Sequence, residues 1–108
     1  MEHKFINRVE LQGQVGTVRF SPGGNSLIAN FSVMVEHELT SREGRPVIEC
    51  TWLNVTAIEG RDVRLDRLAR GSFVHLTGRL RNSKYTDACG MERTFTEIIT
   101  SSLEVIDA

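Results

Sequence analysis

The chain has 108 residues, 40% of them hydrophobic, which is enough for the core of one ordinary domain and too many for a disordered chain. Thirteen Lys and Arg side chains against fourteen Asp and Glu give a net charge of −1, which excludes a polycation and requires any nucleic-acid site to gather positive charge locally. No apolar run reaches membrane-spanning length, and the charged first ten residues lack an apolar signal region. We therefore predict a single cytoplasmic domain over residues 1–108 with no membrane association.

Apolar residues recur mainly with a period of two, which is the period of a half-buried β-strand. A first strand is predicted around residues 9–15, and a second strand follows a turn at 21–26. The remaining strands are predicted at 47–58, 72–82 and 92–106, with a polar loop at 40–46.

The segment 59–71, between the third and fourth strands, is predicted to contain one short helix. Its apolar positions are Val63, Leu65, Leu68 and Ala69. Arg67 and Arg70 suit the negative C-terminal end of a helix, and Gly71 can terminate it.

Five short strands and one helix in a chain of this length favour a small closed barrel, because closure removes unpaired strand edges. We predict an all-β fold, a five-stranded OB-fold barrel with one short helix between strands 3 and 4. A small α+β fold, with a sheet and a helix, stays open at this point.

Two strands carry unusual residues on their outer faces. In strand 3 the apolar set that contains Val55 is assigned to the core, which leaves Trp52 and Asn54 outside. In strand 4, Arg79 and Arg81 share a face that continues to Tyr85. Each feature has a plainer explanation, a Trp in a subunit contact and a solvated basic face. Together they suit unpaired nucleobases, which stack on rings while cations meet phosphates.

Four segments, in this order along the chain, carry a family resemblance: INRVELQGQVG, GNSLIANFSVMVEHE, ECTWLNVTAIEG and LARGSFVHLTGRLRNSKYTDACGMERTFTEI. Together they cover nearly the whole chain, and it resembles the bacterial single-stranded-DNA-binding protein family. The resemblance implies an OB-fold that oligomerises, with a homotetramer favoured and a dimer open. It also implies binding of single-stranded DNA with little sequence preference in replication, recombination or repair, and a cytoplasmic, nucleoid-associated location.

The resemblance also assigns roles to individual residues. Trp52 and Tyr85 match base-stacking positions, and Arg8, Arg81 and Lys84 match basic positions that face DNA, with Arg19 and Arg70 as weaker matches. With the two further outer-face residues added, the predicted DNA-binding set is Arg8, Arg19, Trp52, Asn54, Arg79, Arg81, Lys84 and Tyr85.

The sequence departs from the family pattern at three places. Leu39 and Ile58 are aliphatic where the family has stacking aromatics. The chain also ends at Ala108 without the family's linker and acidic tip, so no tail for recruiting replication enzymes is expected. In this it also looks like the tail-less primosomal replication protein, an accessory OB-fold protein of the same descent.

Two other function classes, an enzyme and a protein-interaction barrel, use residues that this chain also contains. The carboxylates and the three histidines show no catalytic or metal-ligand spacing, so we predict no enzyme, no metal and no cofactor. A protein-interaction barrel anchored by Trp52 uses the same aromatic and basic residues and stays an alternative. Whether RNA binds as well as DNA is also open.

Overall fold

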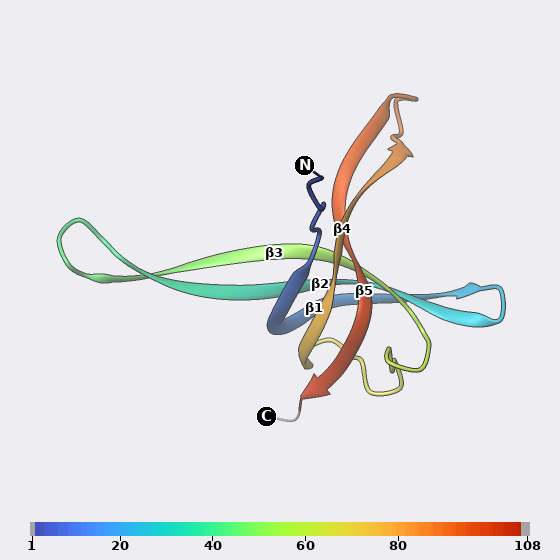
Figure 1. The fold of residues 1–108 in the computed structure, drawn as a ribbon, viewed down its shortest axis with the longest axis horizontal. Coiled ribbons are helices and arrows are strands. Elements are labelled where there is room, and N and C mark those ends of the chain that lie inside the picture. The colour runs from blue at the N-terminus through green and yellow to red at the C-terminus, as the bar shows by residue number, and fades with distance from the viewer. Residues whose placement is uncertain (1, 107–108) are drawn as a thin grey trace.

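The computed structural model describes residues 2–106, and five strands account for most of them. The strands are β1 (Val9–Gly23), β2 (Ser26–Thr40), β3 (Pro46–Ile58), β4 (Phe73–Thr86) and β5 (Glu92–Ile106). They close into a barrel in the order β1-β2-β3-β5-β4 (Figure 1). Neighbouring strands are antiparallel except for β3 and β5, which are parallel. The predicted all-β, five-stranded OB-fold barrel is confirmed.

The core fills the barrel from alternate residues of the strands, as the period of two predicts. The largest fully buried side chains are Leu76, Ile98, Val33, Val55 and Val74. On β3 the predicted division is confirmed, since Val55 is buried while Trp52 and Asn54 are exposed. Thr51, which the same alternation assigns to the core, is exposed because its partner Val35 lies one residue beyond the last residue of β2 that pairs with β1, Met34. From there the β2–β3 hairpin extends beyond the barrel (Figure 1).

The predicted helix at 59–71 is wrong: these residues form turns and isolated bridges, Gly60 with Val63 and Val63 with Leu103. Val63, Leu65 and Leu68 are all buried, but their spacing of two and then three residues would spread them around a helix. The turns instead let each of the three reach the core. Backbone groups find partners outside any helix: Leu103 N–H donates to the Asp62 carbonyl at 2.9 Å, and Gly71 N–H donates to the Val15 carbonyl at 2.9 Å.

Three hairpins continue beyond the barrel, so several strands are longer than their apolar pattern predicts (Figure 1). The turn between β1 and β2 contains only residues 24–25, where the sequence predicted a turn over 21–26. Gly24 has a φ of +70°, a conformation that favours glycine. β4 extends through Tyr85 to Thr86, which pairs with Glu92 across the third hairpin. Cross-strand hydrogen bonds sustain these extensions without a core beneath them.

The barrel closes through a short seam. β3 and β5 pair only at Val55 with Ile98 and at Thr56 with Ile99. Beyond the seam the β4–β5 hairpin parts from β3. A groove therefore opens between this hairpin and the outer faces of β1, β2 and β3.

Candidate nucleic-acid interface

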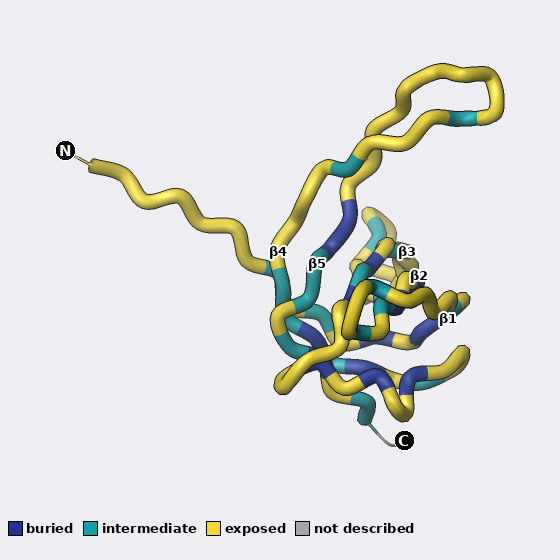
Figure 2. The backbone as a smooth tube through the Cα atoms, turned by 90° about the vertical axis from the view of Figure 1, so that its right-hand side faces the viewer, coloured by how far each residue is buried: buried dark blue, intermediate teal, exposed yellow. Residues whose placement is uncertain are grey.

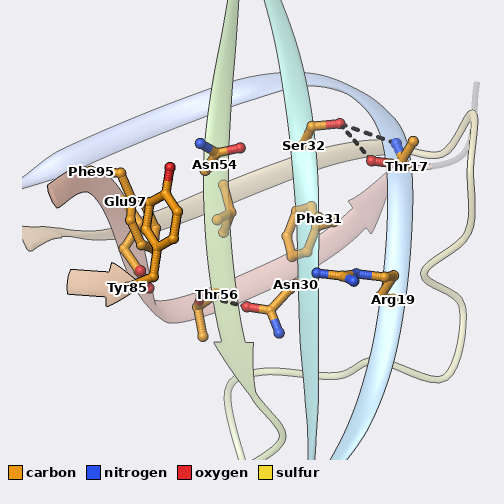
Figure 3. A pocket seen from close by; sticks show the side chains of 11 residues that line it. Thr17, Arg19, Asn30, Phe31, Ser32, Asn54, Thr56, Tyr85, Phe95 and Glu97 are labelled. Atoms are coloured by element: carbon orange, nitrogen blue, oxygen red, sulfur yellow. Dashed lines mark hydrogen bonds between the residues drawn. The ribbon is translucent and has the colours of Figure 1, made fainter. Parts of the chain in front are cut away.

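The groove has a volume of about 650 Å³ and is partly open to solvent. Figure 3 shows the side chains that line it. One wall comes from the β4–β5 hairpin and the other from the outer faces of β1, β2 and β3. The residues that line it are Thr17, Arg19, Asn30, Phe31, Ser32, Asn54, Val55, Thr56, Tyr85, Phe95 and Glu97.

Two aromatic rings form the hairpin wall. Tyr85 and Phe95 meet edge to face, with ring centroids 5.7 Å apart and an interplanar angle of 64°. Tyr85 is 51% exposed and Phe95 36%, so both rings offer surface to a ligand. Phe95 was missed in the sequence, although a count across the hairpin finds it, since Phe95 pairs with Ser83 and so shares the face of Tyr85.

The opposite wall is polar and mostly uncharged. The Thr56 hydroxyl donates to Asn30 Oδ1 at 2.8 Å, and the Thr17 amide donates to Ser32 Oγ at 3.1 Å (Figure 3). Asn54 has no side-chain hydrogen bond to any other residue within 2–106, so its amide can both donate and accept. Arg19 adds a guanidinium to this wall.

Trp52 lies on the same outer face of β3 as Asn54, two residues away, and is 60% exposed. Its indole covers Gly16 of β1: a Cβ on that glycine would lie 2.6 Å from the ring atom Cζ3. The absence of a side chain at Gly16 therefore lets the ring lie against the sheet with most of its surface exposed.

Glu97 lies at the base of the hairpin, where the groove meets the barrel. It is only 5% exposed, and Arg81 Nη2 donates to its Oε1 at 3.1 Å. Burial raises the pKa of Glu97, but the neighbouring hydroxyls of Thr56 and Ser83 and the charge of Arg81 together lower it by more, so its pKa falls below the ordinary value. The carboxylate is therefore ionised at neutral pH, and Arg81 neutralises it.

The hairpin's other cations are also engaged. Lys84 Nζ lies 3.4 Å from Glu92 Oε1, on the face of the hairpin opposite to Tyr85 because neighbouring side chains in a strand point opposite ways. Arg93 Nε donates to Asp87 Oδ2 at 2.9 Å. The hairpin thus presents rings to the groove more than unpaired charge.

The structure brings some of the predicted site residues together at the groove and places the others elsewhere. Arg19, Asn54 and Tyr85 line the groove, Arg81 borders it through Glu97, and Trp52 lies on the adjoining sheet. Arg8 and Arg79 line a neighbouring depression on β4 and β5, and Lys84 lies on the far face of the hairpin. Arg70, one of the two weaker matches, is exposed in the 59–71 segment.

The two aliphatic substitutions are also exposed. Leu39, 40% exposed, pairs with Val47 in the β2–β3 hairpin, and Ile58, 51% exposed, pairs with Ile28 where β3 ends. Neither offers a flat ring for a base.

Among residues 2–106, no three His, Cys, Asp or Glu side chains gather as a metal site would require. Cys50 and Cys89 are both free and exposed. Within the same residues no helix is long and apolar enough to cross a membrane.

Comparison with known proteins gives consistent results. The model of the "Single-strand binding protein family" matches residues 6–106. Single-stranded DNA-binding proteins of Neisseria meningitidis serogroups A and B are 30% identical over 105 residues, covering 94% of this chain and 60% of theirs. This chain thus spans about 60% of the length of these relatives.

Solved structures share the fold. A Plasmodium falciparum SSB, in complex with ssDNA, is 25% identical with a TM-score of 0.78, covering 99% of this chain and 100% of that one. A deletion mutant of the Thermus aquaticus single-stranded DNA binding protein has a TM-score of 0.74 at 20% identity, and the match covers 94% of this chain and 51% of that one. A small single-stranded DNA-binding protein of Streptomyces coelicolor has a TM-score of 0.67 at 22% identity, and the match covers 92% of this chain and 93% of that one. The last two bear on the fold alone.

Proposed function

This chain belongs to the single-strand binding protein family, and from that premise we propose that it binds single-stranded DNA with little sequence preference. Base stacking and phosphate contacts supply the affinity, and the bound strand is protected or organised during replication, recombination or repair. The single observation that carries the proposal is the groove beside the β4–β5 hairpin, with aromatic rings on one wall and, on the other, neutral hydrogen-bonding groups and the guanidinium of Arg19.

The groove suits bases that are not paired. Every base has a π-face that can stack on Tyr85 or Phe95, so these rings contribute affinity without selecting a sequence. Asn54 both donates and accepts, and can therefore meet the edge of any base. Trp52 provides a further exposed ring on the sheet next to the groove.

The proposal extends to assembly, location and chemistry. The chain forms a homo-oligomer, a tetramer in preference to a dimer, in the cytoplasm, and has no catalytic activity. Two bulky apolar residues before β1 support assembly, since Phe5 is 102% exposed and Ile6 88% in the single chain, and a neighbouring copy would remove them from water (Figure 2). Light scattering at micromolar concentration is expected to give the tetramer mass, and a monomer would contradict this part.

The direct test uses Trp52, the only tryptophan in the chain, as the reporter. Titration with oligo(dT) is expected to quench its fluorescence, because a base that stacks on the indole changes its surroundings. A fluorescence anisotropy titration with labelled oligo(dT) measures affinity independently. If neither signal changes, the chain does not bind single-stranded DNA, and the alternative of a protein-interaction barrel gains support. Parallel titration with oligo(U) tests whether RNA also binds.

A further inference from the structure

A second depression, of about 390 Å³, lies on the outer surface of β4 and β5 beside the segment that precedes β1. Arg8 and Arg79 line it, together with neutral groups that include Thr77 and Ser101. No carboxylate belongs to its lining, and neither arginine forms an ion pair or a hydrogen bond with any other side chain in the described part of the chain.

The backbone at Arg8 is held beside β4 by the side chain of the preceding residue, Asn7. The Asn7 side-chain amide donates to the Leu80 carbonyl at 2.8 Å, and the Leu80 amide donates to Asn7 Oδ1 at 2.8 Å. These two bonds fasten the N-terminal segment to the free edge of β4 just beyond the last β1–β4 pair, Val9 with Gly78. Continuing that register by one residue brings Arg8 opposite Arg79.

Two like charges opposite each other on neighbouring strands destabilise a sheet. Elsewhere, Arg81 lies directly opposite Glu97, and Lys84 lies diagonally across the hairpin from Glu92, so each cation has a carboxylate beside it. Arg8 and Arg79 depart from this pattern. An anion between the two guanidiniums would turn the repulsion into attraction, because each planar guanidinium can bind phosphate oxygens in a bidentate manner.

We propose that Arg8 and Arg79 bind one backbone phosphate of the single strand, at a subsite separate from the aromatic groove. This inference rests on the proposed function and specifies a part of the strand's path. Glu97 lines the groove and Ile99 lines the depression, two residues apart on the same face of β5 and so about 7 Å apart along the strand. A strand whose bases occupy the groove can therefore continue directly over the depression.

The chemistry of the two sites is complementary. The groove has two rings, neutral hydrogen-bonding groups and the single guanidinium of Arg19, and the cations of its hairpin wall are already paired with carboxylates. The depression has two unpaired guanidiniums and no ring. Stacking therefore belongs to the first site, and the depression, with two guanidiniums against one, is the stronger site for a phosphate.

The test compares the parent with Arg8→Gln/Arg79→Gln and with a control, Arg61→Gln/Arg64→Gln, which removes the same charge from the 59–71 segment. Arg64 pairs there only weakly with Asp66, at 3.9 Å on the exposed surface. Each protein is titrated with oligo(dT) of increasing length at several salt concentrations. Once the oligonucleotide is long enough to reach the depression, the slope of log K against log salt in the test variant should be shallower by about 0.7. The control should keep the parent's slope.

The readouts separate this inference from the proposed function. The test variant should keep the Trp52 quenching, since the groove is intact, and should melt no lower than the control because a repulsion has been removed. A slope equal to the control's at every length would overturn the phosphate subsite while the groove remains a binding site. Failure of the parent to bind any oligo(dT) would overturn the proposed function and this inference with it.

A last arm uses inorganic phosphate alone, which is expected at millimolar concentration to raise the melting temperature of the parent more than that of the test variant. If it stabilises the parent but not the test variant, and the oligo(dT) slopes are unchanged, the depression holds a free anion and the strand contact is wrong.

Discussion

Trp52 and Tyr85 are exposed to similar fractions, 60% and 51%, but they are supported in different ways. Trp52 projects from β3, and its ring lies over Gly16 of β1. The same length of β3 places Val55 and Ala57 in the core. The position of the indole is therefore fixed by the barrel itself.

Tyr85 projects from a hairpin that has left the barrel, and no core lies beneath it (Figure 2). Its support comes from Phe95 and from ion pairs along the hairpin, of which Arg81 with Glu97 is the one at the base. The comparison indicates that changes near Trp52 act on a rigid platform, whereas changes at the hairpin's base decide where a whole wall of the groove lies.

The largest effect is expected from Arg81→Met, which leaves the buried Glu97 carboxylate without its ion pair. Removing one partner of a buried pair costs roughly 3–5 kcal/mol, and because Arg81 is half exposed we expect about 3 kcal/mol here. Urea unfolding at pH 7 measures this loss. Lys84→Met is the matched control nearer the tip, since its exposed pair with Glu92 contributes at most about 1 kcal/mol.

The pH dependence gives this prediction a second readout. The pKa of Glu97 is lowered in the folded protein from its ordinary value of 4.5, so its contribution is fully present above that value and is lost as the pH falls through the folded pKa. The difference in stability between the parent and Arg81→Met should therefore shrink in acid. A difference that stays constant would show that Arg81 stabilises the hairpin by packing.

The next effect concerns stacking. A base–aromatic stack contributes roughly 1–3 kcal/mol to binding, and Trp52→Ala should cost more than Tyr85→Ala because the indole is larger. Anisotropy titration with labelled oligo(dT) measures both variants, and the oligomeric mass is checked alongside. A Trp52→Ala protein that assembles and binds like the parent would remove the sheet platform from the binding surface.

Gly16→Ala sharpens the comparison without touching a ring. The new methyl group would meet the indole and Ser32 Oγ, each 2.6 Å away, so the ring must tilt away from the sheet. We expect about half the stacking contribution to be lost, roughly 0.5–1.5 kcal/mol of binding, with a shift in Trp52 emission. Gly60→Ala is the control, since the nearest atom to its methyl group would be the Ile58 carbonyl oxygen at 3.9 Å. An unshifted emission spectrum in Gly16→Ala would contradict the packing described for the indole.

Sequence alone predicts the barrel because its strands carry their information locally. The alternation around Val55 and Leu76 identifies the buried faces, and the position of Trp52 on the outer face follows from it. The 59–71 segment is different, because its buried residues are spaced for turns and its backbone partners lie on distant strands. No local pattern contains those partners, and the helix prediction therefore failed.

The site, too, has some residues that the local sequence reveals and some contacts that only the closed barrel creates. Tyr85 is visible in the sequence as a ring in a basic strand, and Phe95 follows once the hairpin register is known. That Glu97 is buried against Arg81, and that Arg8 lies opposite Arg79, depends on which strands the closed barrel brings together. A sequence pattern can therefore list cations but cannot separate the neutralised ones from those available to a phosphate.

The smallest effect is expected at the hairpin tip. Asp87 accepts from Arg93 Nε and from the backbone amides of Met91 and Cys89, each at 2.9 Å, and so closes the turn that contains Gly90. The Arg93 guanidinium and then the Met91 amide hold the pKa of Asp87 below its ordinary value. The stabilisation of the turn by the Asp87 carboxylate is therefore fully present above the ordinary pKa and is lost as the pH falls through the folded pKa.

Asp87→Ala should speed hydrogen exchange at the Met91 and Cys89 amides and weaken oligo(dT) binding slightly, since Tyr85 lies two residues before the turn. Global urea unfolding should be unchanged, because the tip buries no core. Asp66→Ala, in the exposed 59–71 segment, is the control for loss of a surface carboxylate. If Asp87→Ala instead lowers global stability as much as Arg81→Met does, the hairpin unfolds together with the barrel. The two rings would then rest on one cooperative unit, and the distinction between a rigid sheet platform and a separately supported hairpin would be wrong.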